Sequence, residues 1–217
     1  MIQTIIFDFD GLMVESERVC FQTYKEMLAE RGVDFQWETY INEFLGMSAV
    51  STLEKMNRYY GCSFSPKEDA DLFHRREMEI LKEESVPLRP GLLELLDYLD
   101  GNGYRKVIAT SASPDRLHMI LERYDLDTRF NGITTAAEIQ NGKPAPDIFL
   151  KACEKEGISA AEALVLEDSQ AGIEAAYRAG IQVICIPCFK QPEEEYKART
   201  TAVLPSLAEV PQVLEKL

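Results

Sequence analysis

Short apolar runs recur along the chain and predict β-strands. Residues 4–7, 106–109, 163–166 and 182–186 are rich in β-branched and aliphatic side chains, and residues 201–204 form a weaker run of the same kind. Continuous apolar runs of this length are typical of strands that are covered on both faces of a sheet. We therefore expect five core strands, of which the last is the least marked.

Between these runs, apolar residues recur with the period of an α-helix. Four leucines within residues 92–99 occupy positions i, i+3, i+4 and i+7, and residues 117–124 repeat the spacing. Each set forms one apolar stripe along a helix. Pro114 and Pro146 stand where the first residue of a helix belongs. From residue 88 onward helices and strands alternate, which predicts a parallel sheet with helices on both faces.

Residues 15–86 break this alternation because their patterns are helical throughout. One apolar stripe consists of Cys20, Tyr24, Met27 and Leu28. A capping box at residues 65–68, Ser-Pro-Lys-Glu, opens a further helix. A crossover between parallel strands needs only about a dozen residues, so this segment is too long to be a connection. We predict a helical domain at 15–86, inserted into an α/β core that consists of 1–14 and 87–217.

Composition and charge narrow the class of protein. The chain has 23 basic and 37 acidic residues, and its net charge of −14 argues against nucleic acid and anionic membrane partners. Phosphate esters stay possible, because charges beyond roughly 8 Å are screened at physiological salt. With no signal peptide and no membrane-spanning run, we expect a cytoplasmic protein. We interpret Cys185 and Cys188, which form a CxxC, as free thiols rather than a redox or zinc motif.

Two acidic residues follow the first predicted strand. Asp8 and Asp10 lie one residue apart and Gly11 follows them. In an extended segment both side chains point to the same side, at the edge of the sheet where ligands bind in this class of fold. An ionised carboxylate can attack phosphorus, and a second one can move protons. Two acidic residues at this spacing are by themselves more often part of a solvated turn. Whether this pair is functional therefore depends on the residues at the ends of the other predicted strands.

Three other strand ends carry residues suited to phosphate or metal binding. Ser111 lies where a strand runs into a helix, whose N-terminal amides suit phosphate oxygens. Simple capping of that helix by Ser113 is the alternative interpretation, and both can be true at the same time. Lys143 stands between a glycine and a Pro-Ala-Pro stretch that fixes its backbone and aims its ammonium. Glu167 and Asp168 offer hard oxygen ligands of the kind that Mg²⁺ takes.

Taken together, the four segments resemble the four motifs of the haloacid dehalogenase superfamily, in the same order and with compatible spacing. Residues 8–12, 15–17, 142–147 and 166–172 are similar to its β-phosphoglucomutase-like branch, and the match covers essentially the whole chain. The resemblance implies a Rossmann-like core with a helical cap inserted after the first motif. It also implies Mg²⁺-dependent phosphoryl transfer through an aspartyl phosphate.

The resemblance assigns the chemistry residue by residue. Asp8 is expected to be the nucleophile and Asp10 the general acid/base. Mg²⁺ would be bound by the Asp8 carboxylate, the Asp10 backbone carbonyl and Asp168, with Glu167 in or near the coordination shell.

The resemblance also implies how the substrate is held. Ser111, Ala112 and Lys143 would hold the transferring phosphoryl group. In the cap, Gly46 and Ser48 match a substrate loop, and a plain turn between two helices is an equally good interpretation.

The same resemblance leaves two reactions open. Mutases of this branch hold a second phosphate with a histidine and basic cap residues, but this chain has Cys20, Leu45 and Ala49 in that region. We therefore expect a monomeric phosphatase that hydrolyses a small phosphomonoester such as a sugar phosphate, with a mutase as the alternative. A non-catalytic phosphate-binding protein or a phosphorelay module is the alternative of another class. His74 and His118 are expected on helices in structural roles.

Overall fold

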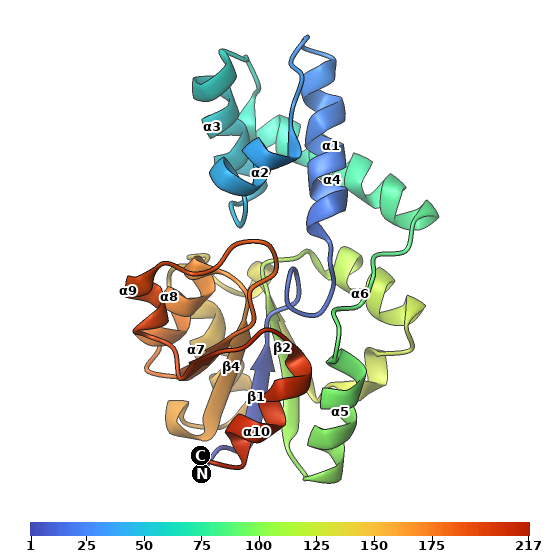
Figure 1. Ribbon diagram of the computed structural model, residues 1–217. Coiled ribbons are helices and arrows are strands. Elements are labelled where there is room, and N and C mark those ends of the chain that lie inside the picture. Colours follow the sequence, from blue (N-terminus) through green and yellow to red (C-terminus); the bar gives the residue numbers. More distant parts are fainter. The chain divides into compact units, whose positions relative to one another are not determined.

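The computed structural model describes residues 1–217, which form two compact units (Figure 1). Met1–Glu15 and Leu88–Leu217 make one unit, the core, and Ser16–Pro87 make the other, the cap. The boundaries predicted from sequence lie one residue earlier at each crossing. No helix of the chain combines the length and the apolar character that crossing a bilayer requires.

The core is built on a six-stranded parallel sheet with the order β3-β2-β1-β4-β5-β6. The strands are β1 (Thr4–Phe7), β2 (Arg105–Thr110), β3 (Gly132–Thr135), β4 (Ala163–Glu167), β5 (Gln182–Cys185) and β6 (Ala202–Val203). The first strand in the chain is therefore central, between β2 and β4. This placement brings the residues that follow β1, β2 and β4 to one edge of the sheet.

Strand β3 is absent from the sequence prediction. It holds only four residues, Gly-Ile-Thr-Thr, and lies at the end of the sheet beside β2. The five predicted strands are all present, and the predicted class of fold is confirmed: a Rossmann-like parallel sheet with an all-helical insert.

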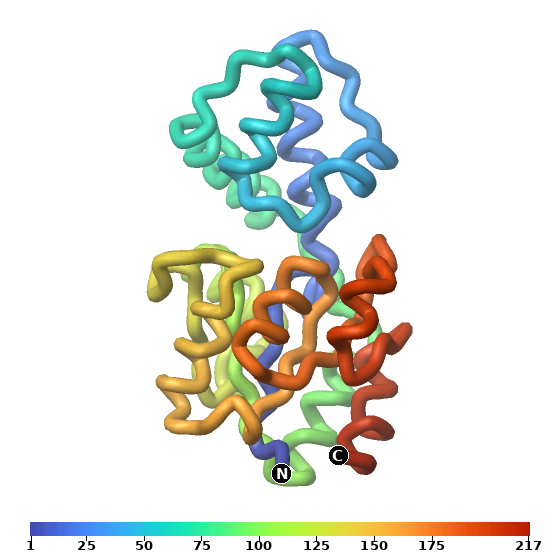
Figure 2. The backbone as a smooth tube through the Cα atoms, turned by 90° about the vertical axis from the view of Figure 1, so that its left-hand side faces the viewer, coloured from blue at the N-terminus to red at the C-terminus, as the bar shows by residue number.

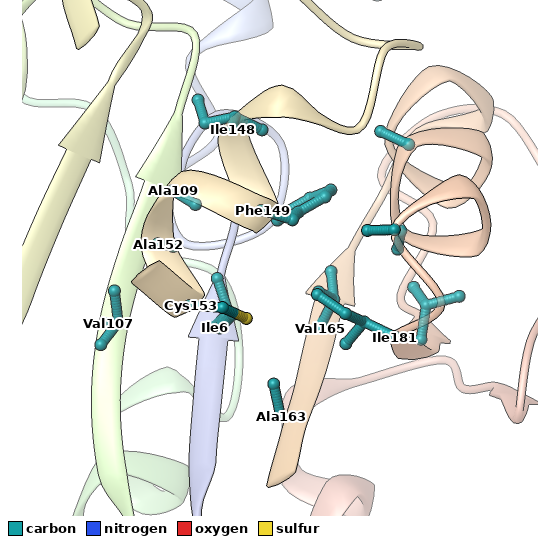
Figure 3. Packing of buried hydrophobic residues seen from close by; sticks show 14 of the residues in the cluster. Ile6, Val107, Ala109, Ile148, Phe149, Ala152, Cys153, Ala163, Val165 and Ile181 are labelled. Atoms are coloured by element: carbon teal, nitrogen blue, oxygen red, sulfur yellow. The ribbon is translucent and has the colours of Figure 1, made fainter. Parts of the chain in front are cut away.

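Helices cover both faces of the sheet. They are α5 (Leu92–Gly101), α6 (Pro114–Arg123), α7 (Asp147–Glu156), α8 (Gln170–Arg178), α9 (Glu194–Lys197) and α10 (Val210–Leu214). Helix α7 contacts β2 and β3, and α8 contacts β4 and β5; their apolar residues meet Ile6, Val107 and Val165 (Figure 3). Alternate strand residues such as Ile5 and Phe7 face the other way and are equally buried, on the side where α5 and α10 pack.

The cap consists of α1 (Glu17–Ala29), α2 (Trp37–Glu43), α3 (Ala49–Tyr60) and α4 (Pro66–Glu83). Its interior is rich in aromatic rings, among them Phe35 and Phe44 at a centroid distance of 5.6 Å. Helix α4 begins where the capping box predicts, but the bonding differs. The Ser65 side chain makes no capping bond, and the Ser65 N–H donates to Asp69 Oδ2 at 2.8 Å rather than to Glu68.

The two chain segments that lead into and out of the cap run side by side in the core unit. Val14 and Leu88 form an antiparallel bridge, and the Arg89 N–H donates to Met13 O at 2.8 Å. The Arg89 guanidinium also donates to Pro187 O at 3.0 Å. Both termini lie at the opposite end of the core from the carboxyl ends of the strands (Figures 1 and 2).

Candidate active site

The candidate site begins with Asp8, the first residue after β1. Its N–H donates to Leu166 O at 3.0 Å, which extends the β1–β4 pairing by one residue and places Asp8 beside Glu167, the last residue of β4. The side chain of Asp8 is 9% exposed and that of Glu167 is fully buried. Two carboxylates therefore lie buried at one edge of the sheet, an arrangement that is unfavourable without positive charge nearby.

Lys143 supplies that charge from a loop far along the chain. Its Nζ lies 2.5 Å from Asp8 Oδ1 and 2.6 Å from Glu167 Oε1, and it is as buried as Asp8. The loop is held at one end by Asp147, whose Oδ2 accepts from the backbone N–H and the side-chain amide of Asn141. The structure thus places the lysine where the expected nucleophile is.

Burial and charge act against each other in this triad. Burial raises the pKa of Asp8 to about 7; the Lys143 ammonium opposes this shift and the Glu167 carboxylate adds to it. Burial alone would lower the pKa of Lys143, but the two carboxylates outweigh it and hold that pKa above its ordinary range. Lys143 therefore stays an ammonium at any physiological pH, beside an aspartate that exchanges protons near neutrality.

Glu167 is bonded on both oxygens. One oxygen faces Lys143, and the other, Oε2, accepts from the N–H groups of Asp168 and Ser169 at 2.8 Å each and from the Ser169 hydroxyl at 3.0 Å. Gly172 makes room for this carboxylate, because a Cβ there would lie 1.7 Å from Glu167 Oε1. Glu167 thus holds the loop that presents Asp168.

The acidic side chains form a cluster that suits a hard cation. One carboxylate oxygen from each of Asp8, Glu167 and Asp168 lies within 4.8 Å of the others. The backbone at Gly11 passes so close to this cluster that a Cβ would lie 2.1 Å from Asp168 Oδ2, and its φ of +77° also favours glycine. Oxygen donors of this kind and number fit Mg²⁺.

The side chain of Asp10 meets a residue that the sequence reasoning missed. Arg116, the third residue of α6, donates from Nη1 to Asp10 Oδ2 at 2.7 Å, and its Nη2 lies 2.7 Å from Asp10 Oδ1. A signal for it exists in the sequence. A cation in the first turn of a helix opposes the helix dipole, so an arginine just after Ser113-Pro114 indicates an anionic partner nearby.

Ser111 and Ala112 follow β2 at the same edge of the sheet. Ser111 is exposed, whereas the Ala112 N–H donates to Thr110 Oγ1 at 3.0 Å, so a phosphate contact there would share or replace this bond. The interpretation of Ser113 as a helix cap is wrong in one respect. Ser113 occupies the N-cap position of α6, but its side chain makes no capping hydrogen bond.

Gly46 and Ser48 belong to the cap. Gly46 has a φ of +75° in the turn after α2, and Ser48 caps α3 by accepting from the Ser51 N–H at 3.3 Å. The turn interpretation therefore accounts for their local geometry, and a substrate contact stays a prediction. Cys20 donates to Glu77 Oε1 at 3.4 Å.

The cysteines are all free thiols, as predicted for the CxxC. Cys185 is fully buried in β5. Burial, with a further contribution from the Glu167 and Asp168 carboxylates, raises the pKa of Cys185 to about 12. Such a thiol stays protonated and is a poor nucleophile, so it is unsuited to redox exchange.

Comparison with known proteins identifies the family. Residues 5–186 match the family described as haloacid dehalogenase-like hydrolase. The chain belongs to this family. The matched range takes in all four segments at the sheet edge and the whole cap.

Individual relatives of this haloacid dehalogenase-like hydrolase are similar over almost their full length. Protein CbbY of Rhodobacter capsulatus is 31% identical over 91% of this chain and 90% of its own. The Drosophila melanogaster protein named "Probable pseudouridine-5′-phosphatase" is 32% identical over 94% of this chain and 89% of its own. The crystal structure of a CbbY mutant from Rhodobacter sphaeroides in complex with xylulose-(1,5)bisphosphate has a TM-score of 0.83, at 26% identity over 96% of each chain.

Proposed function

We propose that this haloacid dehalogenase-like hydrolase is a Mg²⁺-dependent phosphatase of small phosphomonoesters, acting through a phosphorylated Asp8. The observation that carries this proposal is the buried triad at the end of β1, where Lys143 lies between Asp8 and Glu167. A nucleophilic carboxylate needs a fixed position and a cation that offsets the charge of the incoming phosphoryl group. The triad supplies both.

The metal assignment rests on the donor set. Asp8 and Asp168 are the preferred carboxylate ligands, with the Asp10 backbone carbonyl as a further ligand implied by the family motif. Glu167 is a weaker candidate, because Lys143 and three donors of the 168–169 loop already engage its oxygens. Bound Mg²⁺ would offset negative charge on the transferring phosphoryl oxygens.

The reaction follows from the two aspartates. An Asp8 oxygen attacks phosphorus as the bond to the substrate oxygen breaks, and Asp10 in its acid form gives its proton to that oxygen, which leaves as an alcohol. Asp10, now a carboxylate, then takes a proton from the water that attacks the aspartyl phosphate. The bond between phosphorus and Asp8 breaks, inorganic phosphate leaves, and Asp10 is an acid again.

Lys143 and the residues after β2 would hold the phosphoryl group. The Lys143 ammonium already lies 2.5 Å from the attacking carboxylate, so it would contact a phosphoryl group that arrives there. Ser111 is exposed at the neighbouring strand end and offers a hydroxyl. We assign both to phosphate binding, with the Ala112 amide as a further donor.

The substrate class is drawn from the relatives. One has been crystallised with a sugar bisphosphate and another is named for a nucleoside phosphate, so we propose a phosphorylated sugar or sugar-containing metabolite as the substrate. That the enzyme is a monomer is a separate part of this proposal and does not rest on the relatives. A second phosphate needs cations in the cap for mutase chemistry. The cap positions identified from sequence hold Cys20, Leu45 and Ala49 instead, which favours hydrolysis.

A panel assay tests this function. Purified protein would be incubated with phosphorylated sugars, glucose 1-phosphate with its bisphosphate, and p-nitrophenyl phosphate, with Mg²⁺ or with excess chelator. We expect release of inorganic phosphate only with Mg²⁺, and none from Asp8→Asn. Undiminished activity in chelator would overturn the metal assignment. An isomerised sugar phosphate without free phosphate would establish a mutase.

A further inference from the structure

The pair formed by Arg116 and Asp10 joins two distant parts of the core. Asp10 lies in the loop after β1, and Arg116 lies 106 residues later in the first turn of α6. The two terminal nitrogens of the guanidinium each lie 2.7 Å from a different carboxylate oxygen of Asp10: Nη1 from Oδ2 and Nη2 from Oδ1. The Nη1 contact is a hydrogen bond and the Nη2 contact is an ion pair, and together they hold the carboxylate in one position.

The two partners differ in exposure. The Arg116 side chain is 4% exposed, whereas the Asp10 side chain is 30% exposed. The carboxylate is thus held from the protein side and reachable from the solvent side. Each carboxylate oxygen has a second lone pair, so the guanidinium leaves Asp10 able to exchange a proton with a bound molecule.

A purely structural role for the pair is poorly supported, because backbone hydrogen bonds already hold the loop. The Gly11 N–H donates to Val14 O at 2.9 Å, and the Met13 N–H donates to Phe9 O at 2.9 Å. These bonds turn the chain after Asp10 without any side chain. Meanwhile a buried arginine is costly unless it is well paired, so its presence at Asp10 calls for a reason other than loop stability.

We propose that Arg116 is a positioning residue for catalysis. It holds the Asp10 carboxyl group where that group passes a proton to the leaving oxygen and later takes one from water. This assignment rests on the proposed phosphatase function and deepens it. Arg116 itself touches neither phosphorus nor the metal in this scheme and acts only through Asp10.

Leaving-group dependence separates this role from general damage. An alkyl phosphate needs a proton on its departing oxygen, whereas p-nitrophenyl phosphate departs as a stable phenolate. In Arg116→Met we expect kcat/KM for an alkyl phosphate to fall about 10²-fold or more, the range of general acid catalysis, and kcat/KM for p-nitrophenyl phosphate to fall less than about 10-fold. Water attack also slows, so p-nitrophenol should appear in a burst of about one equivalent per enzyme.

A double-mutant cycle supplies the second test. If Arg116 acts through Asp10, Asp10→Asn combined with Arg116→Met should be no slower than Asp10→Asn alone. Arg116→Lys keeps the positive charge but loses the guanidinium group. Its kcat/KM for the alkyl phosphate should lie between those of wild type and Arg116→Met. Arg116→Lys also serves if Arg116→Met does not fold. Arg129→Met is the matched control, because Arg129 also contacts two carboxylates, Asp97 and Asp100, from a 3₁₀ turn beyond α6.

The outcomes are distinct. Equal losses with both substrates and no burst, an additive double mutant, or the same substrate ratio in the Arg129 control would overturn the assignment. Wild-type protein that hydrolyses neither substrate with Mg²⁺ would overturn the proposed function and the assignment together. An active wild type with an unchanged ratio in Arg116→Met would overturn the assignment alone.

Discussion

Replacement of Lys143 by methionine would leave two buried carboxylates facing each other. Lys143 lies 2.5 Å from Asp8 and 2.6 Å from Glu167, and methionine fills a similar volume without charge. Removing one partner of a buried ion pair costs about 3–5 kcal/mol, because the remaining charge is uncompensated. For a chain of this size we expect the melting temperature of metal-free protein to fall by about 6–20 °C.

The pH dependence identifies the cause of that loss. The folded-state pKa of Asp8 lies above its unfolded value, so the folded state binds the extra proton and stability falls as pH rises toward 7. The Lys143 ammonium lowers the pKa of Asp8, so without it the folded variant keeps the Asp8 proton up to a higher pH than wild type does. Its deficit relative to wild type should therefore grow above about pH 7, by up to about 1.4 kcal/mol per pH unit.

Thermal unfolding followed by circular dichroism, in chelator at pH 6 and pH 8, measures this difference. Lys151→Met is the matched control, because Lys151 makes an exposed ion pair with Glu154 at 2.9 Å, which is worth about 0–1 kcal/mol. Mg²⁺ should restore part of the stability of Lys143→Met by supplying positive charge. A deficit that is equal at both pH values, or no larger than that of the control, would refute the electrostatic reasoning.

Three further outcomes are expected. Since the pKa of Asp8 is about 7, protons compete with Mg²⁺ below neutral pH, and the apparent dissociation constant from calorimetry should rise about tenfold per pH unit there. Gly11→Ala and Gly32→Ala both place alanine at positive φ, which should cost Gly32→Ala about 1 kcal/mol of stability. Gly11→Ala should lose more than that and also weaken Mg²⁺ binding, because its Cβ displaces Asp168. Cys185 should resist a thiol reagent in the native protein and react after denaturation, as a buried thiol does.

Most of the fold follows from patterns that carry their own physical reason. The central strands are continuous apolar runs because both of their faces are covered, and the cap stands out because its length exceeds any crossover. Strand β3 escapes such reasoning. Gly132 and the two threonines make a weak strand signal, and the segment is ordered by pairing with β2 and by contact with α7, which are tertiary interactions.

The candidate site likewise has a part that could be predicted from the sequence and a part that could not. Asp8, Glu167 and Asp168 converge because the carboxyl ends of parallel strands meet at one edge, so their grouping could be predicted from strand ends alone. Lys143 lies in the loop between β3 and α7, and its place beside them depends on the strand that the sequence does not reveal. The hydrogen-bond and ion-pair partners of each side chain could not be predicted in this way. The bonding of Glu167 to its own loop depends on the turn at Ser169, and the pairing of Asp10 with Arg116 depends on where α6 lies.

The bridge between Val14 and Leu88 has a consequence for how this enzyme can change. The segments on either side of the inserted unit form a two-stranded stem, held together by backbone hydrogen bonding in the core. The seventy or so residues between Val14 and Leu88 are therefore an insertion whose two ends are already fixed next to each other. Lengthening or exchanging what the stem carries alters the loop-closure entropy only slowly with length. Recombination at this stem would exchange the inserted unit and leave the residues at the sheet edge unaltered, so the two units can diverge on separate evolutionary courses.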